Sequence, residues 1–273
     1  MRERAELAGA RRVVVKVGSS SISGENAHKI QTIVDGLAAA HARGTEVVLV
    51  SSGAIATGMP YLSLDERPVD LATQQAAAAV GQNVLIYRYQ DALRPFQIVA
   101  GQVLLTAGDL ENTTHRSNAR RAMERLLGLR ILPIVNENDT VATHEIRFGD
   151  NDRLAAMVAE LIGADALVLL SDIEALYTRP PSEPGARPID TVAHDDDLSG
   201  FEFGATVVNS VGTGGAATKA SAARLAAASG IGVLVTSADL VDEALSGASI
   251  GTWFAPNPAV TPSSATAPLR TGV

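Results

Sequence analysis

Six continuous apolar runs, separated by longer alanine-rich segments, are the feature that most constrains the fold of this 273-residue chain. Within each run apolar residues follow one another without polar alternation, which is typical of strands buried on both faces. The segments between them are long enough for helices. This alternation predicts an α/β fold with a mostly parallel central sheet and helices on both of its faces. The expected strands are 12–17, 46–51, 98–105, 130–135, 166–171 and 232–236; the expected helices are 26–43, 69–93, 117–127, 151–162 and 216–228.

Composition excludes several classes of function. A net charge of −8 offers no extended basic surface for a nucleic-acid backbone. The absence of cysteine excludes disulfides and thiolate catalysis. No apolar run reaches the length of a membrane span, and the first twelve residues lack the apolar core of a signal peptide. We therefore expect a cytoplasmic protein with no nucleic-acid or membrane partner.

Two stretches break the alternation of strands and helices. Residues 178–198 are rich in proline and acidic residues, which predicts a surface excursion rather than a core element. Proline, serine, threonine and alanine dominate from Pro256 onward, and we expect residues 258–273 to form a disordered tail.

Two of the three lysines lie beside glycine-bearing turns. Lys16 ends a predicted strand just before Gly18, and Lys219 closes a glycine-rich loop that leads into a predicted helix. A glycine loop at a helix N-terminus gathers N–H donors around phosphate oxygens, and lysine adds a compact charge. An ordinary strand end and a glycine cluster at a helix start are the alternatives that either turn leaves open by itself.

Polar residues follow three other predicted strands. Ser52 and Gly53 could help enclose a small polar substrate, and Ser171 with Asp172 could contact a ribose or adenine unless Asp172 only bonds its own backbone. Residues 136–152 contain five carboxylates and three amides. Such acceptors could bind an ammonium group, organise lysines or hold magnesium through water. Helix capping would explain one of these carboxylates but not all five.

Taken in order, the motifs resemble those of the amino acid kinase family, over about residues 12–254. They are VVVKVGSS, VVLVSSGAIATG, AAVGQ, VNENDTVAT, FGDND, LLSDIEALYT and GTGGAATK. The resemblance implies a three-layer α/β/α sandwich formed by residues 1–257. It further implies a glutamate-binding lobe at about 12–162, a nucleotide-binding lobe at about 163–257, and a form without the C-terminal PUA domain that many bacterial members carry.

The run VNENDTVAT with EIRFGDND is specific to the member of the family that acts on glutamate. The resemblance therefore implies MgATP-dependent transfer of a phosphoryl group to the γ-carboxylate of L-glutamate, giving L-glutamyl 5-phosphate in the first step of proline biosynthesis. It also implies ATP and Mg²⁺ as cofactors, feedback inhibition by proline, a homodimer or homotetramer, and a transient contact with the next enzyme of the pathway.

Roles for individual residues follow from the same resemblance. Lys16 and Lys219 would flank the transferred phosphoryl group, and Asp152 would hold both lysines; we expect Lys16→Ala and Lys219→Ala to fold normally but lose turnover. No residue is expected to bind a metal directly, and Gly18 and Gly53 would line the phosphate path. The residues implied for glutamate are Ser52, Gly53, Asn136, Asp139, Asp150 and Asn151. Those implied for the nucleotide are Lys16, Gly18, Ser171, Asp172, Thr213, Gly214, Gly215, Ala216, Ala217, Thr218 and Lys219.

Two local departures from the family pattern are present. Ala175 stands where the family usually has glycine, and residues 115–119 differ from the sequence that usually precedes Asn-Ala.

Two alternative functions remain open. A kinase for acetylglutamate, carbamate, aspartate or a nucleoside monophosphate is one alternative, which the carboxylates of residues 136–152 disfavour for acceptors that carry phosphate. A non-catalytic sensor of the same fold is the other, and the retention of both lysines and Asp152 disfavours it.

Overall fold

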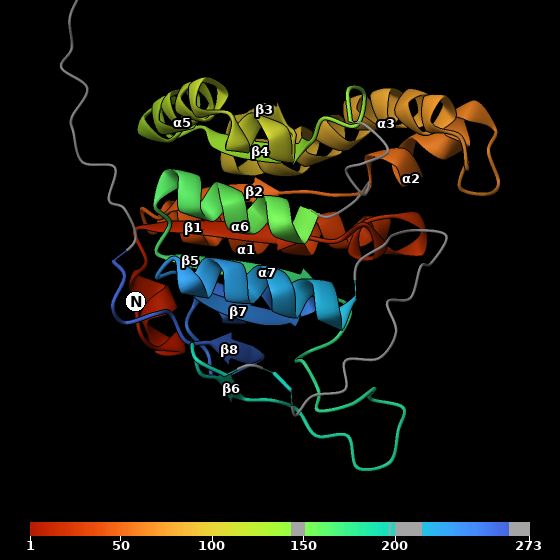
Figure 1. Ribbon diagram of the computed structural model, residues 1–273. Coiled ribbons are helices and arrows are strands. Elements are labelled where there is room, and N and C mark those ends of the chain that lie inside the picture. Colours follow the sequence, from red (N-terminus) through yellow and green to blue (C-terminus); the bar gives the residue numbers. More distant parts are fainter. Residues whose placement is uncertain (143–150, 197, 200–214, 262–273) are drawn as a thin grey trace, which may run out of the picture.

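The computed structural model of the chain describes residues 1–142, 151–196, 198–199 and 215–261, and it is built around one eight-stranded sheet (Figure 1). The strand order is β3-β4-β2-β1-β5-β7-β8-β6. The first six strands in this order, β3, β4, β2, β1, β5 and β7, are parallel to one another. Strand β8 runs antiparallel to β7, and β6 runs parallel to β8. The strands are β1 Arg12–Val17, β2 Glu46–Val50, β3 Ala100–Leu105, β4 Leu132–Glu137, β5 Ala166–Ser171, β6 Thr191–Val192, β7 Gly232–Ser237 and β8 Thr252–Phe254.

Strand register brings several polar residues to the same edge of the sheet. Lys16 on β1 lies opposite Val50 of β2 on one side and Leu169 of β5 on the other. Val50 in turn lies opposite Val135, directly before Asn136. Because parallel strands end at one edge of the sheet, the residues that follow these strands converge there.

Successive residues of the central strands point to opposite faces, and a helical layer covers each face (Figure 1). Val14 and Leu169 pack into the cluster that contains buried residues of α5, α6 and α7. Val13 and Val15 pack into a second cluster that contains buried residues of α1, α3 and α8. The expected α/β/α arrangement with a mostly parallel sheet is confirmed.

The helices mostly follow the predicted segments. Two of them, α6 and α7, have the expected bounds, and none of the described helices is long and apolar enough to cross a membrane. The α-helices are α1 Lys29–Ala42, α2 Ala54–Gly58, α3 Leu71–Leu93, α4 Ala107–Glu111, α5 Thr113–Gly128, α6 Asn151–Ile162, α7 Ala216–Ala228 and α8 Val241–Leu245. The 3-10 turns are η1 Arg4–Gly9, η2 Ser19–Ser21, η3 Gly24–His28, η4 Met59–Leu62, η5 Arg94–Phe96 and η6 Ala238–Leu240.

Side-chain caps explain two helix starts that differ from the prediction. The Asn112 carboxamide accepts hydrogen bonds from the backbone N–H groups of Thr114 and His115, so α5 begins four residues earlier than expected. The Asp70 carboxylate accepts from the N–H of Thr73, which fixes the start of α3 at Leu71.

Two expectations about the sheet are wrong. Strand β3 is not buried on both faces, because it is the last strand at its edge and pairs only with β4. The stretch 178–198 is not wholly a surface excursion, since it contains β6, and Ile189 and Val192 are buried. The Thr252 hydroxyl donates to the Ile189 carbonyl at 2.6 Å and ties this stretch to β8. Strands of two and three residues carry too little periodicity to be recognised in a sequence.

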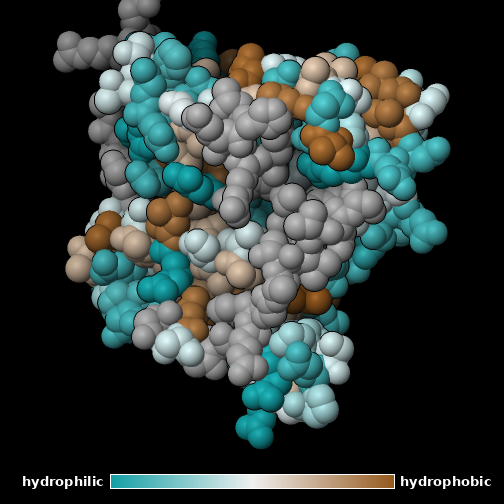
Figure 2. Space-filling view, turned by 45° about the vertical axis from the view of Figure 1, so that its right-hand side comes forward, coloured by the Kyte–Doolittle hydropathy of each residue, from teal (hydrophilic) through white to brown (hydrophobic). Residues whose placement is uncertain are grey.

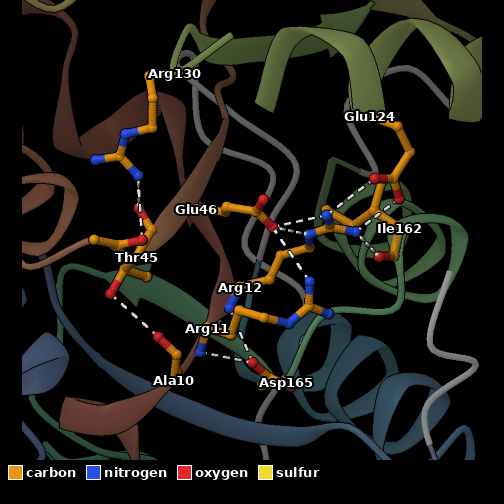
Figure 3. Close-up of polar contacts among 10 residues, drawn as sticks. Ala10, Arg11, Arg12, Thr45, Glu46, Glu124, Arg130, Ile162 and Asp165 are labelled. Atoms are coloured by element: carbon orange, nitrogen blue, oxygen red, sulfur yellow. Dashed lines mark hydrogen bonds and ion pairs between the residues drawn. The ribbon is translucent and has the colours of Figure 1, made fainter. Parts of the chain in front are cut away.

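A buried arginine, Arg12, links several elements at the amino-terminal ends of the central strands, where β1 begins (Figure 3). The Arg12 guanidinium donates to Glu46 of β2 at 2.7 Å, to Glu124 of α5 at 2.8 and 3.1 Å, and to the carbonyl of Ile162 at the end of α6. Asp165 accepts from the backbone N–H of Arg12 at 2.9 Å. One side chain therefore links two strands and two helices at the edge remote from the polar cluster.

Candidate active site

Lys16, Asp152 and Lys219 meet at the carboxyl edge of the sheet. The Lys16 ammonium lies 2.6 Å from one oxygen of Asp152, and the Lys219 ammonium lies 3.4 Å from the other. The three residues come from the end of β1, the first turn of α6 and the first turn of α7. Two ammonium groups and one carboxylate give the trio a formal net charge of +1, which suits it to anionic ligands.

Asp152 is held in its charged form. Burial alone would raise its pKa, but the charges of Lys16 and Lys219, with hydrogen bonds from Lys16 and Thr218, lower the pKa to about 2. Asp152 is 2% exposed and lies in the first turn of α6, with its carboxylate directed at the lysines. Asp152 therefore forms ion pairs with both lysines.

The first turn of α7 supports this geometry. The Thr218 hydroxyl accepts a hydrogen bond from the Gly215 N–H at 3.0 Å and lies 3.2 Å from the Asp152 carboxylate. It thus links the start of α7 to α6. Lys219, one residue further on, is directed at the same carboxylate.

A pocket opens over the trio at the same edge. Figure 2 brings this side of the molecule forward and shows a surface of mixed polarity, with hydrophobic residues gathered near its top. Polar and charged side chains dominate the described lining of the pocket. Its lining residues are Lys16, Gly18, Ser19, Ser20, Ser52, Gly53, Ala54, Ile55, Ala56, Arg67, Asn136, Asp139, Asn151, Ser171, Asp172, Ile173, Gly215, Ala216 and Lys219.

Glycines shape the part of the pocket that follows β2. Gly53 has φ +89°, a backbone conformation that L side chains rarely adopt, and it directs the chain from Ser52 into α2. Helix α2 then packs against α3 at backbone contact: a Cβ on Gly81 would lie 1.8 Å from the carbonyl oxygen of Ala54. These close approaches fix the position of the loop that carries Ser52.

Gln82 of α3 supports Asn136. The Asn136 carboxamide donates to the Gln82 side-chain oxygen at 3.3 Å, and Gln82 donates to the Glu137 carbonyl at 3.3 Å. Asn136 also accepts from the N–H of Glu137 at 2.9 Å. Both ends of the Asn136 side chain are thus held by neighbours while the residue lines the pocket.

Asp139 is a buried carboxylate at the pocket wall and is 7% exposed. Burial and the nearby charge of Glu137 raise its pKa to about 7, against the opposing effect of the Arg67 guanidinium. A carboxylate with so little hydration is well suited to binding a ligand ammonium group, which would restore the ionised form.

Asn151 presents an unused acceptor. Its side-chain oxygen is buried and has no hydrogen-bond partner among the residues that the structure describes. The residue begins α6 and lines the pocket. Because a buried polar atom without a partner costs free energy, a ligand donor is a natural complement to it.

Ser171 ends β5, on the other side of Lys16, and Asp172 follows it; both residues line the same pocket. The Ser171 hydroxyl donates to the Asp172 carboxylate at 3.1 Å. Ala175, further along this turn, is buried and is not among the residues with positive φ. The backbone there does not require glycine, so alanine is accommodated without strain.

The structure brings most of the predicted site residues into one pocket but not all of them. Asp150, Thr213 and Gly214 lie outside the described residues. Ala217 and Thr218 line a different surface depression along α7, together with Arg153 and His194. Sequence reasoning did not select Arg67 or Gln82; Gln82 lies within the motif AAVGQ, whereas nothing in the sequence marks Arg67.

The described residues contain no group of three or more histidine, cysteine, aspartate or glutamate side chains arranged to hold a metal ion. Both oxygens of Asp152 face lysines.

Comparison with known proteins gives the class to which this fold and site belong. Residues 11–237 match the Amino acid kinase family. The chain is 72% identical over 253 residues to "Glutamate 5-kinase" of Clavibacter sepedonicus, with 93% of this chain and 97% of that protein covered. It is 70% identical to the protein of the same name from Leifsonia xyli, with 93% and 94% covered. The chain therefore belongs to the amino acid kinase family, and these relatives place it among the glutamate 5-kinases.

Solved structures agree on the fold. Carbamate kinase from Giardia lamblia bound to AMP-PNP superimposes with a TM-score of 0.67 at 14% identity, covering 92% of this chain and all of that one. UMP kinase from Bacillus anthracis gives a TM-score of 0.62 at 14% identity, covering 91% and 97%. At such identities the likeness establishes the fold alone.

Proposed function

We propose that this chain transfers the γ-phosphoryl group of ATP to the γ-carboxylate of L-glutamate, forming L-glutamyl 5-phosphate and ADP in the first step of proline biosynthesis. The observation that carries the proposal is the ion-paired trio of Lys16, Asp152 and Lys219, of which the two lysines line the pocket. High identity to glutamate 5-kinases over almost the whole chain supports the choice of acceptor.

The reaction needs positioning and charge stabilisation more than proton transfer. A γ-carboxylate is already ionised at neutral pH, so it attacks phosphorus without a general base, and the bond to the ADP oxygen breaks as the new P–O bond forms. Negative charge on the transferred group is offset by Lys16 and Lys219. Asp152 keeps both ammonium groups directed at one point, which is the preorganisation that phosphoryl transfer requires.

Acceptor binding falls to the side of the pocket formed after β2 and β4. Asp139 pairs with the ammonium group of glutamate, and Asn136 and Asn151 complete the polar wall. Ser52, Gly53 and Asp150 belong to the same proposed subsite, although Asp150 lies outside the described residues. Residues 12–162 would form this acceptor-binding lobe.

Nucleotide binding falls to the other side, in residues 163–257. Ser171 and Asp172 after β5, and Gly215 and Ala216 at the start of α7, line that side of the pocket. The N-terminus of α7 supplies N–H donors and the positive end of the helix dipole to phosphate oxygens. Gly18 lies beside Lys16 on the phosphate path.

Magnesium would enter with the phosphate oxygens of ATP and would keep several of its waters. When bound it would neutralise phosphate charge. The chain's own contribution would remain the placement of the two lysines.

Regulation and assembly extend this proposal. Proline would inhibit through the acceptor subsite, because it shares the α-ammonium and α-carboxylate groups of glutamate. A dimer or tetramer in the cytoplasm is proposed, with transient contact to the next enzyme because acyl phosphates hydrolyse readily.

Release of ADP with a panel of acceptors tests the proposal. L-glutamate, N-acetyl-L-glutamate, L-aspartate, carbamate and UMP are each incubated with enzyme, ATP and magnesium. The proposal requires ADP release with L-glutamate far above the rate with the others. Release only with another acceptor would assign a different kinase of the same fold, and ATP binding without release for any acceptor would favour a sensor.

A further inference from the structure

Glutamate brings three charged groups into the pocket, and the residues discussed so far account for two of them. The γ-carboxylate lies at the lysine trio during transfer, and the α-ammonium group faces Asp139. The α-carboxylate needs a partner of its own, a cation or a set of N–H donors, because burying an unpaired carboxylate is costly.

The described lining of the pocket contains three cations: Lys16, Lys219 and Arg67. Both lysines contact Asp152 and are required at the phosphoryl end. Arg67 lies in the segment between α2 and α3, is half-buried, and makes no hydrogen bond or ion pair with any residue that the structure describes. Among the described lining residues, Arg67 is thus the cation left for the α-carboxylate.

Arg67 lines the same pocket as Asp139, the residue proposed to bind the α-ammonium group of the acceptor. Arg67 influences the ionisation of Asp139 through space, without an ion pair within 4.0 Å between them. The ammonium and carboxylate groups of an amino acid are bonded to the same carbon, so their partners must be neighbours that leave room for the ligand. Asp139 and Arg67 both line the pocket, and the influence of Arg67 on Asp139 without a direct ion pair is consistent with that requirement.

We infer that Arg67 is a specificity-determining residue that binds the α-carboxylate of the acceptor amino acid. This inference rests on the proposed function and adds a recognition element to it. A guanidinium presents two parallel N–H donors to a carboxylate, which selects a free α-carboxylate over a carboxamide or a hydrogen at the same position.

The test compares L-glutamate with L-isoglutamine, in which a neutral carboxamide replaces the α-carboxylate while the α-ammonium and γ-carboxylate groups remain. KM, or Ki against glutamate, is measured for both in the wild type, Arg67→Gln and Arg67→Lys. Arg94→Gln is the matched control, since Arg94 is 72% exposed and pairs with Asp91 outside the pocket. Turnover of L-glutamate by the wild type is established first, and its failure would defeat the proposed function rather than this inference.

For Arg67→Gln we expect KM for glutamate to rise roughly 10- to 100-fold with little change in kcat or in KM for ATP. The preference for glutamate over isoglutamine should fall by a similar factor, and Arg67→Lys should recover part of it. An unchanged KM for glutamate would overturn the inference. Equal losses for glutamate and isoglutamine would also overturn it, because they would mean that Arg67 acts only through Asp139.

Discussion

The ammonium group of Lys16, on β1, lies 2.6 Å from the carboxylate of Asp152, in the first turn of α6, although the two residues are far apart in the sequence. Both side chains are buried, with exposed fractions of 4% and 2%. Lys219 approaches the same carboxylate from a third element at 3.4 Å. A single buried aspartate on α6 therefore pairs with two cations, one from β1 and one from α7.

The lysines are expected to act on turnover. Lys219→Met and Lys16→Met should each lower kcat by about 10²-fold or more, because each removes a positioned charge that stabilises the transferring phosphoryl group. Steady-state kinetics with glutamate and ATP measures the effect. Lys29→Met is the control, as Lys29 pairs with Asp239 on the surface. Near wild-type turnover in either trio variant would contradict the role assigned to it.

The same variants should differ from the wild type in stability. Removing Lys16 leaves the Asp152 carboxylate buried with the longer contact to Lys219 as its ion pair and the Thr218 hydroxyl as its hydrogen-bond donor. We therefore expect a loss of several kcal/mol, on the order of that found for broken buried ion pairs. Urea denaturation measures it. Lys16→Met combined with Asp152→Asn should recover much of the stability but none of the turnover. This replaces the simpler expectation that single lysine variants fold normally.

Protonation of Asp139 should lower kcat/KM for glutamate on the acidic side of the pH profile. Burial and Glu137 raise its pKa to about 7 in the free enzyme, so kcat/KM for glutamate should fall as pH decreases through that value and the carboxylate becomes protonated. Asp139→Asn should remove this fall, at greatly reduced kcat/KM. Asp91→Asn, a change at an exposed surface position, is the control. A pH profile unaltered by Asp139→Asn would contradict the assignment.

Asp139 should also make the stability of the ligand-free protein depend on pH, with its stabilising contribution lost as pH rises. Its pKa is raised on folding, so its favourable contribution is complete below about pH 4 and is lost as pH rises through about 7. Asp139→Asn should therefore be more stable than the wild type at pH 8, by roughly 1–4 kcal/mol, and the difference should close toward pH 4. Denaturation at several pH values measures it, and a difference that grows on acidification would contradict the account.

Gly81 is expected to control the loop that carries Ser52. In Gly81→Ala the new Cβ would lie 1.8 Å from the Ala54 carbonyl oxygen, so α2 must move away from α3. We expect lower stability and a higher KM for glutamate. Gly128→Ala is the matched control, because a Cβ there meets nothing within 4 Å and alanine favours a helix. Equal effects of the two substitutions on KM would contradict the argument.

Arg12 should matter for stability and not for catalysis. Arg12→Met breaks the links among β1, β2, α5 and α6 and should cost about 2–3 kcal/mol, since the carboxylates it leaves are nearly a quarter exposed and can hydrate. Arg11→Met is the control: its guanidinium is 58% exposed and lies 3.6 Å from Glu46, so its loss should cost less than 1 kcal/mol. If kcat changes in Arg12→Met at a temperature where this variant is folded, the claim that Arg12 affects stability and not catalysis is wrong.

Much of this arrangement could be predicted from the sequence, because its signals are local. Continuous apolar runs predicted the six parallel strands, and the glycine-bearing turns at Lys16 and Lys219 predicted where phosphate could bind. Asp152 was named from its motif, but its contact with both lysines depends on strand order, which no local pattern contains. Arg67 was missed because its place at the pocket follows from the packing of α2 against α3. The strands β6 and β8 were missed because they are too short to show a period.

Identification of the product tests the central claim most directly. The enzyme is incubated with L-glutamate, ATP, magnesium and hydroxylamine, which converts an acyl phosphate into a hydroxamate. We expect γ-glutamyl hydroxamate to form in amounts equal to ADP, to be abolished in Lys219→Met and to be suppressed by proline. Stoichiometric hydroxamate that proline does not suppress would remove only the proposed regulation. ADP released without any γ-glutamyl hydroxamate would contradict phosphoryl transfer to the γ-carboxylate of glutamate.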